Sequence, residues 1–244
     1  MTQYEATWPS VNRHEPGGIP AVGPNAGAAV FTRRDFGGER VPLAVGSYTA
    51  AQLKAHDLTP KNIDGIWPAD GYRTLAYAGD DLSGASVTLC QPMPDLGLAR
   101  PVVSLRVTFD PARWFHLVNV ASGLVVDGGG VVGSPLRVWA PEDGTTLQFQ
   151  LVETDGGCYA LANRANGCVL DATEPATLPV QSLYVGVAGQ QWSITFDGEV
   201  AAIANRATGL LLDGGGPVPS GSPLRQSADD SGPNLRWRFV AVRP

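Results

Sequence analysis

Short apolar runs, separated by clusters of Gly, Pro, Asn and Asp, follow one another from about residue 29 to the end of the chain. This pattern is typical of β-strands joined by tight turns, and no long segment shows the spacing of an amphipathic helix. The 244 residues include 30 Gly and 20 Pro, and neither residue type suits a helix interior. We therefore predict an all-β protein.

One pattern occurs three times in the second half of the chain. The segments NVASGLVVD, NRANGCVLD and NRATGLLLD keep Asn, Gly and Asp at the same spacing and begin at Asn119, Asn163 and Asn205. Each is followed by an aromatic residue near a predicted strand end, at Phe149, Trp192 and Trp237. A repeat of this length is one supersecondary unit that cannot bury its own apolar face. Three copies predict threefold pseudo-symmetry around a core that the three aromatic residues share.

The polar positions of the repeat have two interpretations. We expect the repeated Asn and Gly to serve the backbone of a turn. The repeated Asp residues are candidate ligand contacts: Asp127, Asp171 and Asp213. Alternatively, Asp127 and Asp213 only initiate the turns before the Gly triplet that follows each of them.

A second duplication lies between residues 29 and 109. FTRRDFGG, which begins at Phe31, reappears as YAGDDLSG from Tyr77, so that aromatic, Asp, apolar and Gly positions repeat at an offset of 46 residues. We interpret each copy as a strand whose aromatic side chain packs over a folded hairpin. Gly38 and Gly84 then supply a backbone angle that a Cβ would strain.

Charge and composition exclude several classes of function. The formal net charge is −6 and the only lysines are Lys54 and Lys61, which argues against nucleic acid as a partner. No apolar run approaches the ~20 residues that a bilayer span needs. The N-terminus lacks the basic and apolar parts of a signal peptide, so either the protein is made without one or the sequence begins after a cleavage site.

Reactive side chains show no catalytic or metal-binding pattern. The three cysteines, Cys90, Cys158 and Cys168, lack metal-type spacing, and we expect three buried, reduced thiols. No pair of histidines has metal-ligand spacing, and we expect His116 to lie at the surface or in the bottom layer of the repeat domain. Neither Gly triplet is followed by Lys-Ser/Thr, and no nucleophile elbow is present. We predict no enzyme activity and no cofactor.

The duplicated segment resembles the βγ-crystallin domain, which is built from two Greek-key motifs. The stretch WPADGY and the predicted closing strand VVSLRV support the resemblance, which covers about a third of the chain. Many microbial members bind Ca²⁺ through six-residue stretches with leading Asn/Asp residues. Residues 60–65 and 99–104 lack these, and only Asp64 and Ser104 offer oxygens at the expected places. We predict no tight calcium site, and Asp64 is the weak candidate ligand.

The endings of the three repeats, LQFQLV, QQWSIT and LRWRFV, resemble the Gln-x-Trp element of ricin-type lectins, a β-trefoil family. The resemblance covers residues 114–244. It implies that an Asp accepts hydrogen bonds from sugar hydroxyls, that an aromatic about a dozen residues later stacks on the ring, and that an Asn before Gln-x-Trp completes the site. This chemistry suits a pyranose, which has an apolar C–H face and a hydroxyl rim.

The three copies differ in completeness. The first has Asp127, Trp139 at the stacking position and Thr146 at the Asn position, and we expect it to be the principal sugar site. The second has Asp171, Leu183 at the stacking position, Tyr184 beside it and Gly189 in place of Asn. The third has Asp213 and Asn234, with Ser227 in place of the aromatic. We expect Trp139 to be a shallow residue that contributes little to the core.

Together these patterns predict a Pro- and Gly-rich tail over residues 1–28, a βγ-crystallin-like domain over 29–109 and a ricin-type β-trefoil over 110–244. The predicted function is non-catalytic carbohydrate recognition, with glycans as partners and galactose-type sugars as the first class to test. One alternative is a proteinase inhibitor or antimicrobial protein that acts through the crystallin-like domain and is targeted by the trefoil. Another is a structural packing unit that has lost both ligand functions.

Overall fold

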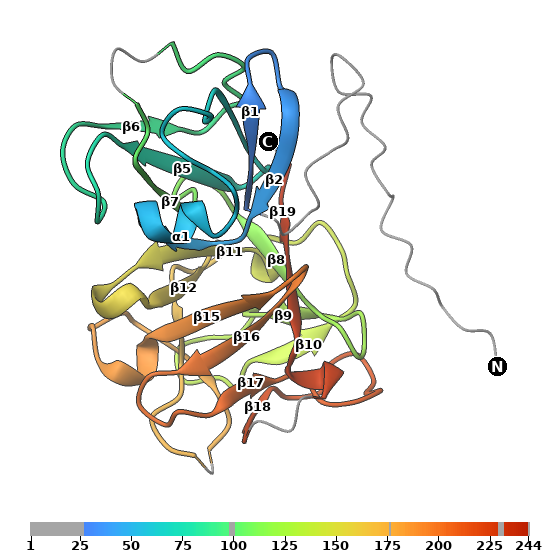
Figure 1. Ribbon diagram of the computed structural model, residues 1–244. Coiled ribbons are helices and arrows are strands. Elements are labelled where there is room, and N and C mark those ends of the chain that lie inside the picture. The colour runs from blue at the N-terminus through green and yellow to red at the C-terminus, as the bar shows by residue number, and fades with distance from the viewer. Residues whose placement is uncertain (1–26, 98–100, 176, 229–231, 244) are drawn as a thin grey trace.

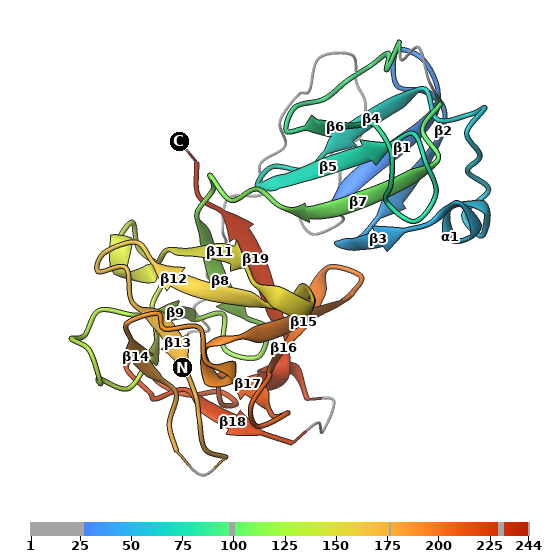
Figure 2. The same ribbon diagram turned by 90° about the vertical axis from the view of Figure 1, so that its left-hand side faces the viewer.

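The computed structural model describes residues 27–97, 101–175, 177–228 and 232–243. These residues form two neighbouring domains built almost entirely from strands, with the first above the second in Figure 1 and above and to the right of it in Figure 2. The predicted all-β class is confirmed. Of the predicted tail only residues 27 and 28 are described, and the first strand already begins at Ala28.

The described part of the first domain contains seven strands and one short helix. They are β1 (Ala28–Arg33), β2 (Gly37–Leu43), β3 (Gly46–Tyr48), α1 (Ala50–Lys54), β4 (Gly65–Pro68), β5 (Tyr72–Tyr77), β6 (Ser86–Leu89) and β7 (Ser104–Phe109). Buried and partly buried positions alternate strictly along β5, as expected for a strand with one face on the core. Thr49 and Gln52 form a capping box that starts α1, and the helix buries only Leu53.

The two motifs of this domain exchange a strand. The sheets have the orders β2-β1-β4 and β3-β7-β5-β6, so β3 leaves the first motif and pairs with β7 of the second. In return, Met93 of the second motif forms an antiparallel bridge to Ile66 in β4. This arrangement is a pair of Greek keys packed as a sandwich, the architecture that the duplication predicts.

Matching left-handed backbone angles confirm the predicted duplication of the folded hairpin. The β1–β2 and β5–β6 hairpins have positive φ values at three equivalent places: Asp35 (56°), Phe36 (55°) and Gly38 (74°) in the first, and Asp81 (52°), Leu82 (59°) and Gly84 (78°) in the second. In the first hairpin, the ring of Phe36 lies 5.1 Å from that of Phe31, centroid to centroid. At Gly38 a Cβ would lie 2.4 Å from the Thr32 hydroxyl oxygen, so only Gly fits.

The second domain consists of three consecutive units of four strands. The first unit contains β8 (Phe115–Asn119), β9 (Val125–Asp127), β10 (Arg137–Trp139) and β11 (Phe149–Glu153). The second contains β12 (Tyr159–Asn163), β13 (Val169–Asp171), β14 (Val180–Ser182) and β15 (Trp192–Asp197). The third contains β16 (Val200–Asn205), β17 (Leu211–Asp213), β18 (Arg225–Ser227) and β19 (Trp237–Ala241). Short 3-10 turns lie at η1 (Thr145–Leu147), η2 (Asp155–Gly157), η3 (Ala188–Gln190) and η4 (Pro233–Leu235).

The threefold repeat closes on itself around an aromatic core. β19 pairs with β8, which joins the last unit to the first. Phe149, Trp192 and Trp237 are fully buried, and the two indole N–H groups donate to the Leu170 carbonyl at 3.2 Å and the Leu212 carbonyl at 2.9 Å. The prediction that these aromatics form a shared core is therefore confirmed.

The repeated Asn residues hold the turns, as predicted. Their Nδ2 atoms donate to backbone carbonyls of a neighbouring unit, from Asn119 to Asn234 at 2.8 Å, from Asn163 to Thr146 at 2.7 Å and from Asn205 to Gly189 at 2.8 Å. The repeated glycines take nearly identical left-handed angles at Gly123 (70°), Gly167 (70°) and Gly209 (72°). Each Asn thus ties its own turn to another unit, which explains why the triplet pattern persists in the sequence.

An aromatic cluster joins the two domains. Phe109, at the end of β7, and Tyr72, at the start of β5, are both buried, and their ring centroids lie 5.2 Å apart. Phe109 also contacts the rings of trefoil residues Phe115 at 5.4 Å, Tyr159 at 5.3 Å and Phe239 at 5.1 Å. Ion pairs Arg113–Asp70 and Arg106–Glu153 flank the cluster. In both views β8 and β19 extend towards the first domain.

The structure corrects one expectation about a single residue and narrows another. Cys90 is exposed, whereas Cys158 and Cys168 are buried, so only two of the three free thiols lie in the interior. His116 is buried, like all five residues of β8, which excludes the surface position of the two that we considered. Its Nδ1 atom lies 3.1 Å from the Leu147 carbonyl oxygen, and burial lowers the pKa of the imidazole.

Candidate functional site

The first repeat presents three candidate side chains on one face of the β9–β10 hairpin. The strand register places Arg137 opposite Asp127 and Trp139 opposite Val125. Because alternate residues of a strand point to the same face, Asp127, Arg137 and Trp139 share a face. The intervening Val126 and Val138 are fully buried in the trefoil core. The hairpin therefore brings together Asp127 and Trp139, the predicted sugar contacts, and adds a cation between them.

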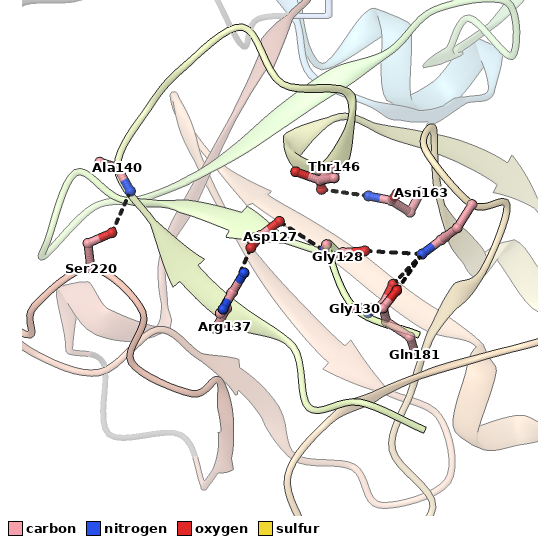
Figure 3. Close-up of polar contacts among 11 residues, drawn as sticks. Asp127, Gly128, Gly130, Arg137, Ala140, Thr146, Asn163, Gln181 and Ser220 are labelled. Carbon is pink, nitrogen blue, oxygen red and sulfur yellow. Dashed lines mark hydrogen bonds and ion pairs between the residues drawn. The ribbon is translucent and has the colours of Figure 1, made fainter. Parts of the chain in front are cut away.

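The Asp127 carboxylate already has a partner at each oxygen. Arg137 Nε donates to Oδ2 at 2.7 Å (Figure 3), and the Gly129 amide donates to Oδ1 at 2.9 Å. The Asp127 side chain is only 3% exposed, whereas that of Arg137 is 43% exposed. The bond from Gly129 is the turn-initiating contact that we considered as the alternative role of Asp127. Arg137, which sequence reasoning missed, covers the carboxylate.

The guanidinium of Arg137 also lies over Trp139. Its central carbon is 4.5 Å from the centroid of the indole ring, within the range of a cation–π contact. The rest of the indole is partly buried against Val118, Val125 and Leu147. A Cβ at Gly221 would approach the indole to 3.3 Å. The expectation that Trp139 contributes little to the core is therefore wrong, although one face of the ring lies under a displaceable side chain.

Thr146 contributes to this region through its backbone. Its carbonyl oxygen accepts from Asn163 Nδ2 at 2.7 Å and from the Gly128 amide at 2.9 Å. Asn166 Nδ2 donates to the carbonyls of Gly128 at 3.1 Å and Gly130 at 3.3 Å. These bonds from the second repeat fix the loop that supplies the Gly129 amide to Asp127. Thr146 thus helps to shape the site, while a role for its hydroxyl in sugar binding stays a prediction.

The second repeat has a carboxylate, but no aromatic residue lies at the position equivalent to Trp139. Gln190 Nε2 donates to Asp171 Oδ2 at 3.1 Å, while Oδ1 is buried without a hydrogen-bond partner among the described residues. The β13–β14 register places Ser182, not Leu183, at the position equivalent to Trp139. Tyr184 lies in the loop that follows and is 48% exposed. Any aromatic contact in this repeat would have to come from that loop.

The third repeat holds the polar half of a site. Asp213 Oδ1 accepts from Asn234 Nδ2 at 2.9 Å and from the Gly215 amide at 2.8 Å. The predicted Asp–Asn pair is thus in place. Arg225 lies opposite Asp213 and Ser227 opposite Leu211, so Ser227 occupies the position of Trp139, as predicted. This repeat offers hydrogen bonds without an aromatic platform on its own hairpin.

The two calcium candidates of the first domain lie in different settings. Asp64 lies just before β4, and its amide donates to the Phe31 carbonyl at 3.0 Å. Ser104 is fully buried; its hydroxyl donates to the Gly79 carbonyl at 2.7 Å and accepts from the Leu82 amide at 3.1 Å. Residues 99 and 100 of the second stretch lie outside the described residues. In the described chain, no three His, Cys, Asp or Glu side chains gather as a metal site would require.

Sequence and structure comparisons identify the second domain. A model of the ricin-type beta-trefoil lectin domain-like family matches residues 107–180, which include the whole β9–β10 hairpin. A designed threefold-symmetric protein, ThreeFoil, is 26% identical, with a TM-score of 0.51, over 53% of this chain and 99% of its own. The second domain has the β-trefoil fold, and residues 107–180 match the ricin-type lectin family. This family match supports carbohydrate binding as the general class of function.

Two further solved structures are similar to parts of this chain. The exo-beta-1,3-galactanase 1,3Gal43A of Clostridium thermocellum is 26% identical over 57% of this chain, with a TM-score of 0.51; the match spans 32% of the galactanase chain. A βγ-crystallin domain from Flavobacterium johnsoniae is 24% identical over 34% of this chain and 94% of its own, with a TM-score of 0.33. A search of curated protein sequences gives no match.

The first domain is βγ-crystallin-like, as its two Greek keys with exchanged strands indicate. Among the described residues, no helix has the length and apolar character that crossing a membrane would need.

Proposed function

We propose that this protein binds carbohydrates without acting on them chemically, and that the first trefoil repeat is its principal site. The observation that carries the proposal is the placement of Asp127, Arg137 and Trp139 on one face of a single hairpin. An indole beside a charged pair suits a pyranose, whose C–H face packs on the ring while its hydroxyls meet the polar groups. Galactose-type sugars are the first class to test.

A neutral sugar has to move the Arg137 side chain before it can stack on Trp139. The cost has two parts, about 0.5–1 kcal/mol for an exposed cation–π contact and, because the Asp127 carboxylate is buried, more than the roughly 0.2–1 kcal/mol of an exposed ion pair. Together these terms weaken the binding of a neutral sugar about tenfold or more relative to an uncovered indole. A single site of this kind binds weakly, so useful affinity comes from several sites acting together.

The other two repeats are candidates for such additional sites. In the third, Asp213 and Asn234 supply the hydrogen-bonding groups, and in the second Asp171 and the exposed ring of Tyr184 supply a carboxylate and a stacking surface. Neither repeat carries carboxylate, cation and indole on one hairpin face. We therefore expect both to bind more weakly than the first repeat.

The proposal is tested by isothermal titration of the full chain with methyl β-galactoside and, as a specificity control, methyl β-glucoside. We expect Trp139→Leu to lower the affinity for the galactoside at least tenfold, because the stacking face is lost. Trp114→Leu is the matched control: Trp114 is also partly buried and also lies under an arginine, with Arg164 5.5 Å from its ring centroid. It should change the affinity less than twofold.

Two results would count against the proposal. If Trp139→Leu, with a thermal unfolding curve that confirms a folded protein, binds as tightly as the unaltered chain, the first repeat is not the site. If the unaltered chain binds neither sugar at millimolar concentration nor any member of a glycan array, carbohydrate recognition itself is refuted.

A further inference from the structure

We propose that the first repeat is selective for pyranoses that carry an anionic substituent, a carboxylate or a sulfate, and that Arg137 is the specificity-determining residue. This inference rests on the proposed carbohydrate-binding function. It follows from which polar groups at the hairpin are free to meet a ligand and which are already occupied.

The carboxylate of Asp127 is not the group that a ligand meets first. Both of its oxygens accept hydrogen bonds within the protein, at 2.7 Å from Arg137 and 2.9 Å from Gly129. The side chain is 97% withdrawn from solvent, since its exposed fraction is 3%. Each oxygen could accept a second hydrogen bond, but the side chain is buried, so a sugar hydroxyl reaches Asp127 only if Arg137 moves aside. The acceptor that the resemblance to ricin-type lectins implies is therefore covered here.

The guanidinium of Arg137 is the exposed polar group instead. Its side chain is 43% exposed, and its only hydrogen bond among the described residues is made by Nε. The two terminal nitrogens are therefore free, and together they present a fork of N–H donors. Asp127 and the indole of Trp139 hold this fork in place, so little side-chain freedom is lost when a ligand binds.

A site that offers donors selects a ligand that offers acceptors. A carboxylate or sulfate accepts two parallel hydrogen bonds from a guanidinium, which is stronger and more directional than contact with a neutral hydroxyl. Because Asp127 already neutralises part of the charge of Arg137, we expect the gain in affinity to lie at the lower end of what a guanidinium–anion contact contributes. An acidic sugar also leaves the Arg137–Asp127 pair intact, whereas a neutral sugar has to displace it.

The other repeats lack this arrangement. The position equivalent to Arg137 is Val180 in the second repeat, which has no charge to offer. In the third repeat it is Arg225, which is exposed, but no ion pair joins it to Asp213 among the described residues. Its neighbour at the indole position is Ser227, so nothing holds the guanidinium over a ring. Selectivity for acidic sugars is therefore assigned to the first repeat alone.

The test is isothermal titration of the full chain with three ligands that differ only at C6: methyl galactoside, methyl galacturonide and methyl galactoside 6-sulfate. We expect at least one acidic ligand to bind about tenfold more tightly than the neutral one, a difference of about 1.4 kcal/mol. The two acidic ligands distinguish recognition of a carboxylate from recognition of a sulfate. Raising the salt concentration should reduce the preference, since it screens the contact.

The decisive variant is Arg137→Gln, with Arg164→Gln as its control. Arg164 also lies over an indole, and its Nη1 atom donates to Gln148 Oε1 at 2.6 Å, but it is not part of the hairpin. Arg137→Gln should abolish the preference for acidic ligands and, by uncovering Trp139 and Asp127, tighten binding of the neutral galactoside several-fold. Arg164→Gln should leave both affinities unchanged.

The failure of this inference differs from the failure of the proposed function. Equal affinity for all three ligands, or an acid preference that survives in Arg137→Gln, overturns the role of Arg137 while carbohydrate binding stands. If none of the three ligands, and no other glycan, binds the unaltered chain, the proposed function itself is overturned. The unfolding temperature of each variant, compared with that of the unaltered protein, shows whether the variant is folded.

Discussion

The contact between the two domains depends on Phe109. This side chain is 2% exposed, and its ring lies within 6.0 Å of five other rings, centroid to centroid: Tyr72, Phe115, Tyr159, Phe196 and Phe239. Replacement of a buried Phe by Ala costs about 3–5 kcal/mol, because apolar contacts are lost and a cavity remains. Since four of the five rings belong to the trefoil, we expect most of this loss to fall on the domain contact. Phe109→Ala should therefore uncouple the two domains.

Differential scanning calorimetry of the full chain tests this prediction. We expect the unaltered protein to unfold in one cooperative transition, and Phe109→Ala to unfold in two, the earlier one belonging to the less stable domain. Phe36→Ala is the control, because Phe36 packs on Phe31 and Trp67 within the first domain, at 5.1 Å and 4.8 Å between ring centroids. It should lower the unfolding temperature and keep a single transition. Two well-separated transitions in the unaltered protein would show that the domains already unfold independently and that Phe109 does not couple them.

Two further predictions concern buried titratable groups. The hydroxyl of Tyr72 is buried without a hydrogen-bond partner among the described residues, and burial raises the pKa of the phenol well above its usual value. Tyr72→Phe should therefore leave the free energy of unfolding unchanged or raise it by about 1 kcal/mol in urea titrations, and a loss of more than that would contradict the assignment. The pKa of His116 is lowered from 6.5 chiefly by burial, so the unfolded chain binds the proton more readily. Stability should fall as pH falls below about 6.5 and level off once pH passes the lower folded pKa, and in His116→Gln this part of the pH dependence should disappear.

Most of the fold could be predicted from the sequence because both domains contain internal repeats. The equal spacing of Asn, Gly and Asp reflects a turn that each unit builds in the same way, as the three glycines with φ near 70° confirm. The 46-residue offset in the first domain reflects two hairpins that need the same left-handed angles. Each of these features depends on a few neighbouring residues, so the same residue types recur along the sequence at a regular spacing.

The candidate site could be predicted only in part, because the hairpin loops differ in length. Asp127 is paired with a residue ten positions later, Asp171 with Val180 and Asp213 with Arg225, so a fixed count along the chain does not give the register. This is why Leu183 was expected at a position that Ser182 occupies. The signal for Arg137 was present, since Arg and Trp in Arg-Val-Trp are two residues apart and thus share a strand face.

No pattern in the sequence indicates the contact between the two domains. Phe109 and Tyr72 lie at strand ends, where an aromatic residue can equally close its own sandwich or meet another surface. Only the structure shows that both rings belong to the trefoil core cluster. The burial of His116 was missed for a related reason. Alternation along β8 predicts one exposed face, but every residue of this strand is covered.

Stacking of a sugar on Trp139 can be observed by nitrogen–proton correlation spectroscopy of the full chain during titration with methyl β-galactoside. The chain has six Trp, and the Trp139→Leu and Trp114→Leu variants assign the indole N–H signals of these two residues. We expect a saturable shift of the Trp139 signal, while that of Trp114 stays in place. If calorimetry shows binding but the Trp139 signal does not move at saturating galactoside, the sugar does not stack on Trp139.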